Sequence, residues 1–536
     1  MNPGRRVDLY DTTLRDGTQR AGISVSVEDK LRILGRLDRF GVPYVEGGWP
    51  GSNPKDAEFF ARAQSRTLET ATLCAFGMTR RPLVSCDEDQ QLAALVEAGC
   101  PVVCIVGKSW TLHVREALKV SLDENLAMVA ESVAWLTAHG RRVFFDAEHF
   151  FQGYADDASY ATAVVQRAAD AGAEVVVLCD TNGGTLPHEV AAVVSSMVER
   201  LPVAVAGHFH DDAGCGVANS LAAVQAGASQ IQGCVNGYGE RCGNADLLAV
   251  AANLQLKMGI PVLPEGRLAE LTDVSRYVAE VFNQPPETHR AYVGNFSFAH
   301  KGGLHVSAVV RTARAYEHID PSDVGNDRHL LTSDLSGAAT LRATAAALGL
   351  SMDPPAIASA LERLKRLEFE GFSFEAADGS LELLLRSAQG WQQRYFTPIS
   401  FRAIVEEAPG ASRGTAAAEA TVRLEIDGER TVAAAEGQGP VDSMYRALRV
   451  ALRPTYPEIA AFHLTDYKVH ILDPASATAA KVRVLIETTD QSGSWMTVGV
   501  STDIIEASWQ ALIDSIVVGL LHAHVQPVGS PLARAE

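Results

Sequence analysis

The chain is organised around Gly207-His208-Phe209-His210-Asp211-Asp212-Ala213-Gly214. The preceding run, Val203 to Ala206, is apolar and typical of a buried strand. Residues two apart in a strand point to the same side, so His208 and His210 direct two imidazoles toward one point where the strand ends. Two neutral imidazoles that converge in this way suit a divalent metal ion. Taken alone, the pair is equally consistent with two ordinary histidines at a strand end.

This strand is one of eight strand-like runs in the first half of the chain. They span 7–14, 44–48, 72–76, 102–106, 142–148, 174–180, 203–210 and 230–235. Segments with helical periodicity separate them, as at 28–40, 123–139 and 160–171, and Pro187 marks a helix start. Eight evenly spaced units in about 255 residues favour a (β/α)8 TIM barrel, with an open doubly wound sheet as the alternative.

Reactive side chains follow several of the predicted strands. In a TIM barrel the chemistry lies at the C-terminal ends of the strands. Arg15 and Asp16 follow the first strand, Glu148 ends the fifth, and Thr181 follows the sixth. One aspartate with two histidines would give a metal three ligands and leave positions open for a substrate. Each residue alone is also explained as a strand-end cap or part of a buried ion pair.

Composition limits the possible partners and compartments. The formal net charge is −19, which argues against binding to nucleic acid or to an anionic membrane. No run approaches about 20 uninterrupted apolar residues, so no membrane span is expected. The N-terminus has no apolar signal core, and the eight cysteines form no CxxC pair. We therefore expect a cytoplasmic protein with reduced thiols.

The pattern predicts three domains, with limits at 1–262, 263–397 and 398–536. The first is the catalytic barrel, and the second consists of mainly helical linker subdomains, with helices at 265–282 and 341–367 and an acidic loop junction at 368–379. The third is an α+β domain of two βββα units. Its strands are expected at 401–406, 420–426, 431–435, 467–472, 482–488 and 496–500, and its helices at 441–452 and 504–522. Asp427-Gly428 predicts a hairpin turn.

Two motifs carry a family resemblance. Leu14-Arg15-Asp16-Gly17-Thr18-Gln19, with Lys30 beyond it, resembles the first signature of the 2-isopropylmalate, citramalate and homocitrate synthases. The segment from Val205 to Gly214 resembles their second signature, and the run from Asn219 to Ala245 strengthens the match. Within this family, 45–54 and 107–110 most resemble the bacterial (R)-citramalate synthases.

The resemblance implies a Claisen condensation of acetyl-CoA with a 2-oxo acid, followed by thioester hydrolysis, and hence an acyltransferase that converts acyl to alkyl. Pyruvate is the expected 2-oxo acid, with Phe76, Val106 and Asp146 as candidate walls around its side chain. The implied cofactor is a divalent ion, which the sequence leaves open among Mg, Mn, Zn and Co. The alternatives are a 2-isopropylmalate or homocitrate synthase, a lyase like 3-hydroxy-3-methylglutaryl-CoA lyase, and a non-catalytic effector-binding oligomer.

The resemblance also assigns roles to residues. The metal ligands would be Asp16, His208 and His210, with Asn244 as a further ligand. Arg15 would bind substrate and stabilise the developing alkoxide. Thr181 would hydrogen-bond the substrate carboxylate, and Glu148 would position substrate and assist proton transfer. Glu148 has a compatible structural role as a salt-bridge partner of Arg15.

The resemblance also suggests the catalytic base and the residues that bind acetyl-CoA. His305 aligns with a family segment that reaches the partner subunit's site, which makes it the candidate base, with Tyr316 as a weaker candidate and His300 as a decoy. The family often has an acidic residue two positions later, whereas this chain has Ser307. The residues implied for acetyl-CoA binding are Gly237, Gly239, Glu240 and Gly243, although a plain turn closing the eighth strand explains these glycines equally well.

The C-terminal domain resembles the regulatory dimerisation domain of the same synthases. A homodimer or larger homo-oligomer is therefore expected, with feedback by an amino acid, isoleucine in a citramalate synthase. The alternative is a purely structural oligomerisation module.

Overall fold

The computed structural model describes residues 6–391, 394–406 and 417–528. The chain divides into two compact units. The first comprises Met1–Phe298 with Ile319–Arg328, and the second comprises Ala299–His318 with His329–Glu536. The domain limits expected at 262 and 397 stay a prediction.

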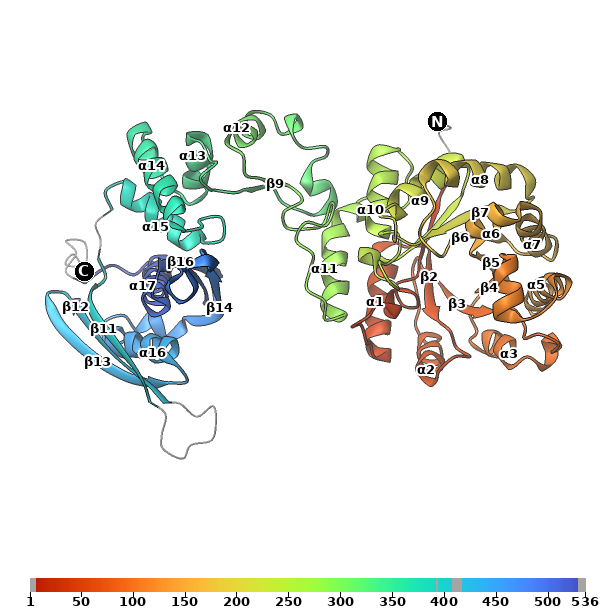
Figure 1. Ribbon diagram of the computed structural model, residues 1–536, viewed down its shortest axis with the longest axis horizontal. Coiled ribbons are helices and arrows are strands. Elements are labelled where there is room, and N and C mark those ends of the chain that lie inside the picture. Colours follow the sequence, from red (N-terminus) through yellow and green to blue (C-terminus); the bar gives the residue numbers. More distant parts are fainter. Residues whose placement is uncertain (1–5, 392–393, 407–416, 529–536) are drawn as a thin grey trace. The chain divides into compact units, whose positions relative to one another are not determined.

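Eight parallel strands close into a barrel in the first unit (Figure 1). They are β1 (Asp8–Asp11), β2 (Tyr44–Gly48), β3 (Thr72–Met78), β4 (Val102–Lys108), β5 (Arg142–Glu148), β6 (Val175–Asp180), β7 (Ala204–Phe209) and β8 (Gln230–Gly233). Each pairs with its neighbours in sequence, and β8 pairs with β1 from Asp8↔Gln230 to Asp11↔Gly233. The TIM barrel is confirmed, and the open sheet is excluded.

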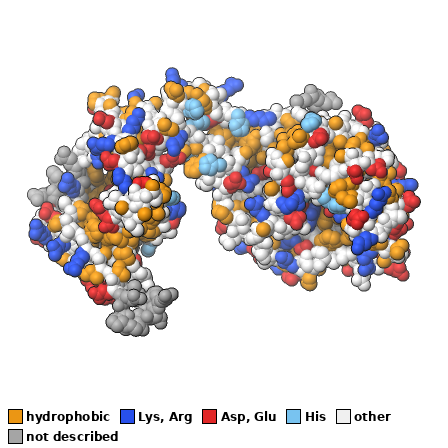
Figure 2. Space-filling model, in the orientation of Figure 1, with side chains coloured by type: hydrophobic (Ala, Val, Ile, Leu, Met, Phe, Trp, Pro, Cys, Tyr) orange, Lys and Arg blue, Asp and Glu red, His pale blue; other side chains and the backbone are white. Residues whose placement is uncertain are grey.

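Helices surround this barrel. They are α1 (Val27–Phe40), α2 (Pro54–Ala63), α3 (Gln90–Glu97), α4 (Thr111–His113), α5 (Leu122–Ala138), α6 (Phe150–Asp156), α7 (Ala158–Asp170), α8 (Pro187–Arg200), α9 (Gly216–Ala226) and α10 (Leu247–Ala252). Ser26 caps α1 by accepting from the Asp29 N–H, and Pro187 occupies the first turn of α8 as expected. Acidic and basic side chains are interspersed over the visible face of the barrel (Figure 2).

The barrel core has two layers. Side chains such as Tyr10, Cys104 and Phe144 fill the inside of the strands, while the opposite faces pack against the helices. Lys30 of α1 is buried; its Nζ donates to the Gly47 carbonyl at 2.9 Å and pairs with Asp56. A buried cation needs such partners, so this contact ties α1 and α2 to the end of β2.

The segment after the barrel begins with α11 (Leu271–Val281). In the second unit, β9 (Ala299–His300) pairs with β10 (His329–Leu330). The other helices of this segment are α12 (Gly303–Arg311), α13 (Ala338–Ala347), α14 (Pro354–Glu370) and α15 (Asp378–Ala388).

One expectation for this segment was wrong and another needs shorter bounds. The single helix expected at 341–367 is split into α13 and α14, because Pro354 and Pro355 cannot continue a helix and Asp353 caps α14 by accepting from the Ala356 N–H. The loop junction expected at 368–379 is present but shorter, spanning 371–377, since α14 runs to Glu370 and α15 starts at Asp378.

The C-terminal part forms the two expected βββα units. The first contains β11 (Thr397–Glu406), β12 (Ala417–Ile426), β13 (Glu429–Gly437) and α16 (Pro440–Leu452), and the second contains β14 (His463–Ile471), β15 (Val482–Thr489), β16 (Ser494–Ser501) and α17 (Ile504–His522). Each antiparallel sheet has its strands in sequence order. Asp427 and Gly428 both have positive φ, as a tight hairpin turn requires.

By length and composition alone, helix α17 is long and apolar enough to cross a membrane. However, 56% of its most apolar window is buried, and its Trp509, Leu512 and Ile516 side chains belong to the core of the C-terminal domain. Core packing therefore accounts for its apolar character. All eight cysteines lie in the described part of the chain, and all are free.

Candidate active site

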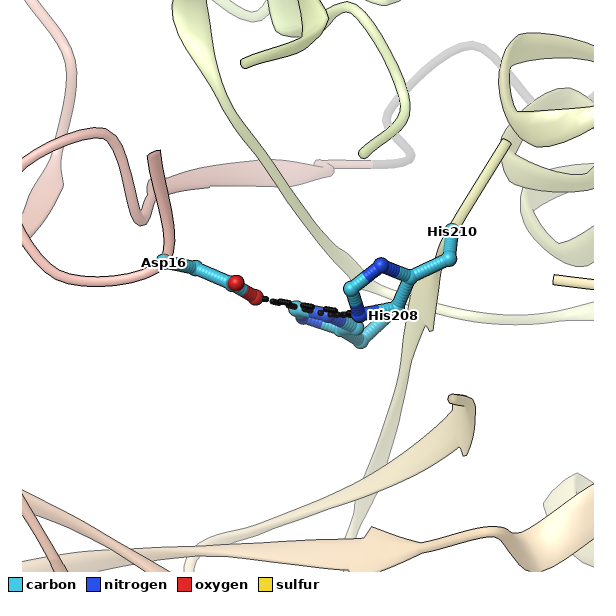
Figure 3. Close-up of side chains that lie close together, drawn as sticks. All are labelled: Asp16, His208 and His210. Atoms are coloured by element: carbon cyan, nitrogen blue, oxygen red, sulfur yellow. Dashed lines mark hydrogen bonds and ion pairs between the residues drawn. The ribbon is translucent and has the colours of Figure 1, made fainter. Parts of the chain in front are cut away.

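Asp16, His208 and His210 converge at the C-terminal end of the barrel (Figure 3). Asp16 Oδ2 lies 3.4 Å from His208 Nε2 and 3.8 Å from His210 Nε2, and the two Nε2 atoms are 3.3 Å apart. All three side chains are buried. Three ligand-type atoms thus face a common point, as the sequence predicted.

The backbone explains this convergence. His208 lies at the end of β7 and pairs in register with Gln232 of β8, while His210 follows the strand and bridges to Asn244. Asp16 belongs to a tight loop after β1, in which the Arg15 and Gly17 N–H groups donate to the Thr12 carbonyl. Strands β1, β8 and β7 are neighbours, so the loop and the histidines meet at one edge.

A chain of hydrogen bonds fixes the His208 ring. His208 Nδ1 lies 2.8 Å from Gln232 Oε1, and Gln232 Nε2 donates to Asp146 Oδ1 at 3.0 Å. Because the amide nitrogen donates to the carboxylate, the amide oxygen faces the imidazole and accepts its Nδ1–H. The Nε2 lone pair of His208 is then left to face Asp16 and His210. Second-shell contacts of this type orient metal-ligating histidines.

Arg15 is held by a buried carboxylate. Its Nε donates to Glu46 Oε1 at 2.5 Å, and Tyr10 Oη donates to Glu46 Oε2 at 2.8 Å. The guanidinium carbon lies 3.9 Å from the centre of the Phe76 ring. Burial alone would lower the pKa of Arg15, but Glu46 and Asp16 outweigh it and raise the pKa, so the guanidinium stays charged. Its Nη atoms form no hydrogen bond among the described residues.

The charge states of Asp16 and His210 suit a metal, whereas the hydrogen bond and attraction to Asp16 outweigh burial and raise the pKa of His208. Burial acts to raise the pKa of Asp16, but Arg15 and His208 outweigh it and hold the pKa well below its usual value. Burial, together with His208, lowers the pKa of His210 to about 4. Asp16 is thus a carboxylate and His210 a neutral imidazole near pH 7, which are the forms that coordinate metal ions.

Asn244 lies beside this cluster in the loop after β8. Its side-chain nitrogen donates to the Tyr238 carbonyl at 3.2 Å, whereas its buried Oδ1 has no hydrogen-bond partner. Gly239 and Gly243 have positive φ, and a Cβ on Gly243 would lie 2.0 Å from the Gly237 carbonyl oxygen. These contacts show that both glycines allow the loop to fold tightly around Asn244.

A cavity of about 400 Å³ opens at the cluster. Of the site residues expected from the sequence, it is lined by Arg15, Asp16, Glu148, Thr181, His208, His210 and Glu240, together with the candidate walls Phe76, Val106 and Asp146. Asn244, Gly237, Gly239 and Gly243 do not line it. The structure therefore gathers most of the expected barrel residues around one space.

Glu148 has a different partner from the one expected. It pairs with Lys108 at the end of β4, while Glu46 occupies the position beside Arg15. The expected salt bridge between Glu148 and Arg15 was therefore wrong, because β2 supplies a carboxylate closer to Arg15.

Thr181 Oγ1 accepts the His149 N–H at 3.0 Å, which leaves the hydroxyl hydrogen free to donate to another group.

His305 and Tyr316 lie in the second unit, where their rings stack with centroids 4.3 Å apart. Both side chains are exposed. Among the described residues no carboxylate contacts the His305 ring, and Ser307 instead accepts from Arg311. The histidine of this segment that does contact a carboxylate is His300, 3.2 Å from Glu317.

Three family models match the chain in succession. One described as HMGL-like covers residues 6–278, one described as homocitrate synthase post-HMGL domain-like covers 292–371, and one described as LeuA allosteric (dimerisation) domain covers 375–519. The (R)-citramalate synthase of Streptomyces coelicolor is 52% identical over 97% of both chains. The chain belongs to the HMGL-like family. It falls in the branch that contains the citramalate and 2-isopropylmalate synthases, as the sequence motifs indicated.

Other proteins similar to the chain are more distant. A probable 2-isopropylmalate synthase from Methanopyrus kandleri is 32% identical over 95% of this chain and 98% of its own. The solved hydroxymethylglutaryl-CoA lyase of Pseudomonas aeruginosa matches with a TM-score of 0.46 and 22% identity, over 53% of this chain and 96% of its own.

The donor set of this family member fits a divalent ion. One carboxylate and two imidazoles supply three ligands, and the unpartnered Oδ1 of Asn244 is an oxygen that burial would otherwise penalise. The set of oxygen and nitrogen donors without thiolate does not select among Mg, Mn, Zn and Co.

Sequence reasoning missed the residues that support the cluster. Glu46 and Lys108 belong to the family motifs at 45–54 and 107–110 but were given no role of their own, and Gln232 was not identified. Polarity on the inner face of a strand was the available signal, because Gln230 and Gln232 alternate with Ile231 in β8 and point away from the apolar outer layer.

We expect Gln232→Leu to weaken metal binding by about 10- to 100-fold, because His208 would lose the acceptor that fixes its ring. His210→Ala should abolish metal retention and turnover together. Retention is measured by chelator competition followed by elemental analysis. Gln230→Leu is the matched control, since Gln230 is buried on the same strand and does not contact His208. Equal affinity in Gln232→Leu and Gln230→Leu would contradict the role given to Gln232.

Proposed function

We propose that the protein is an (R)-citramalate synthase, which condenses acetyl-CoA with pyruvate and hydrolyses the thioester to give citramalate and free CoA. Five (R)-citramalate synthases are 44–52% identical to the chain over at least 95% of its length, and this observation carries the proposal. The 2-isopropylmalate synthases among its relatives are 29–32% identical over the same extent.

The barrel residues support this chemistry. Asp16, His208 and His210, with Asn244, would hold a divalent ion, which supplies Lewis-acid polarisation of the substrate ketone. Arg15 donates to Glu46 through Nε, and its Nη1 lies 3.6 Å from Asp16 Oδ2 without a hydrogen bond, so the Nη groups still have donors for an oxygen of the bound 2-oxo acid. Because the guanidinium is fixed in advance, it stabilises negative charge on that oxygen without reorganising.

The opposite side of the cavity would hold the rest of the substrate. The Thr181 hydroxyl donates to the carboxylate, since its oxygen already accepts the His149 N–H. The Glu148–Lys108 pair places one acidic and one basic group beside the reacting atoms, where they orient substrate and assist proton transfer. Phe76 and Val106 line the same cavity and favour a small 2-oxo acid.

His305 is our candidate for the base that removes a methyl proton from acetyl-CoA, with Tyr316 stacked beside it. A thioester α-proton is far less acidic than an imidazolium with a pKa of about 6.5, so the enolate oxygen also needs stabilisation. Helix α12 is open around His305, which is itself exposed, and Leu304 and Val310 on other sides of the helix are 84% and 56% exposed. We propose that this helix serves the active site of a second subunit in a homodimer or larger oligomer.

We expect CoA release from acetyl-CoA to be faster with pyruvate than with 2-oxoisovalerate, 2-oxobutanoate or 2-oxoglutarate. The cavity walls discriminate by bulk, and a misfit methylene costs about 1–3 kcal/mol, or about 10- to 200-fold in kcat/KM. Thiol release by the metal-loaded enzyme measures the rate with each acid. Preference for 2-oxoisovalerate would identify a 2-isopropylmalate synthase, and cleavage of an added 3-hydroxyacyl-CoA would identify a lyase. No turnover at all would leave a non-catalytic oligomer.

A mixing experiment tests the shared site. Arg15→Gln and His305→Ala should each be inactive alone, yet co-expression should restore about one quarter of wild-type activity, because half of the random dimers carry one intact site of two. Thiol release per active-site pair gives the measurement. Two inactive barrel variants, Arg15→Gln with Glu148→Gln, are the control and should not complement. Failure of the first pair to complement would place His305 within its own chain's site or outside catalysis.

We further propose that isoleucine, as pathway end product, inhibits the enzyme by binding the C-terminal domain. The match to an allosteric dimerisation domain and the two βββα units support regulation there. The free cysteines and the similarity to biosynthetic enzymes such as (R)-citramalate synthase support a cytoplasmic location.

Isoleucine should therefore lower CoA release and raise the thermal midpoint of the full chain, whereas leucine and valine at equal concentration should do so less. The midpoint shift follows from ligand binding to the folded state and needs no turnover. If none of the three amino acids shifts the midpoint or the rate, the domain is a structural oligomerisation module.

A further inference from the structure

A second cavity, of about 420 Å³, lies beside the first on the same end of the barrel. Its lining residues include Arg20 after β1, Asn236 and Tyr238 after β8, Arg276 of α11, and Arg290 and Asn295 beyond that helix. Gln19 and Glu240, the near neighbours of Arg20 and Tyr238, line the first cavity. The loops after β1 and β8 thus form walls of both cavities.

This second cavity is basic in an acidic protein. Three arginines line it against one carboxylate, Glu287, although the whole chain has a net charge of −19. Arg290 is already paired, with buried Asp246 at 3.0 Å and with Glu287 at 2.6 Å. It therefore forms a fixed wall and contributes no uncompensated charge.

Among the residues that the structure describes, the other two arginines have no acidic partner. Arg276 Nη2 donates to the neutral Asn295 Oδ1 at 2.9 Å. The Arg20 guanidinium lies 5.5 Å from the centre of the Tyr238 ring, and no ion pair or hydrogen bond of the described residues engages it. Two guanidinium groups that face one concave space and are not paired with a carboxylate attract an anion, and their forked donors match phosphate oxygens.

We propose that this cavity binds the phosphate groups at the nucleotide end of acetyl-CoA while the acetyl end occupies the metal-containing cavity. This inference rests on the proposed function, in which acetyl-CoA is the one substrate that carries phosphates. The glycine-rich loop with Gly237, Gly239 and Glu240 lies between the two ends of the ligand. Its tight fold lets the pantetheine arm pass close to the backbone.

Calorimetry on the full-length, metal-loaded protein tests the site without turnover. Wild type should bind CoA about 10- to 100-fold more tightly than pantetheine, which lacks the phosphates, because charge-assisted hydrogen bonds would be lost. Arg20→Gln and Arg276→Gln should each weaken CoA binding about tenfold and leave pantetheine binding unchanged. Arg20→Lys should restore part of the loss. Arg167→Gln, an exposed position on α7, is the matched control and should change nothing.

Other outcomes overturn the proposal. Equal binding of CoA and pantetheine by wild type would exclude a phosphate site, as would unchanged CoA binding in both arginine variants. Inorganic phosphate should compete with CoA; if the variants lose phosphate binding but keep CoA binding, the cavity takes free phosphate alone and the proposal is wrong. If CoA binding depends on Arg20 and Arg276 but no 2-oxo acid supports thiol release, the proposed function fails and the phosphate site stands.

Discussion

Strand β8 is the element on which the site depends. It is only four residues long, yet it pairs with β1 on one side and β7 on the other, and so closes the barrel. The loop with Asp16 follows one neighbour, while His208 lies at the end of the other and His210 directly follows it. Hydrogen bonds extend this closure beyond the strands, since the Thr12 N–H donates to the Gly233 carbonyl and Thr13 Oγ1 accepts the Val235 N–H. Without this pairing the three ligands would not share one point.

Buried charge is the second constraint. Glu46 and Asp146 lie inside the barrel, where an unpaired carboxylate is costly. Arg15 and Tyr10 satisfy Glu46, and Gln232 donates to Asp146. Each of these pairs also fixes a group at the mouth of the cavity, the guanidinium in one case and the His208 ring in the other. The same hydrogen bonds that satisfy the buried acids therefore keep the site rigid.

Sequence alone predicted the barrel because its strands are continuous apolar runs with reactive residues at one end. It also predicted the cluster, since the spacing of His208 and His210 and the strand-end position of Asp16 determine where they point. The partners of these residues depend on which strands become neighbours across the barrel. That is why Glu46 and Gln232 were missed and Glu148 was paired with the wrong cation. The break between α13 and α14 was visible in Pro354 and Pro355, but the apolar periodicity on either side concealed it.

The path of the chain has a practical consequence for dissecting the protein. Residues Ile319–Arg328 belong to the barrel unit although the twenty residues before them do not. Within this returning segment Val324 is fully buried and its carbonyl accepts from Thr272 of α11. A gene fragment that stops at Phe298 would lack the returning segment and expose the surface of α11 that this segment covers. After proteolytic cleavage of the chain near Phe298, the returning segment would still be held to the barrel unit by this contact. A separately expressed barrel should therefore extend to Arg328 and keep residues Ala299–His318 as a connecting loop.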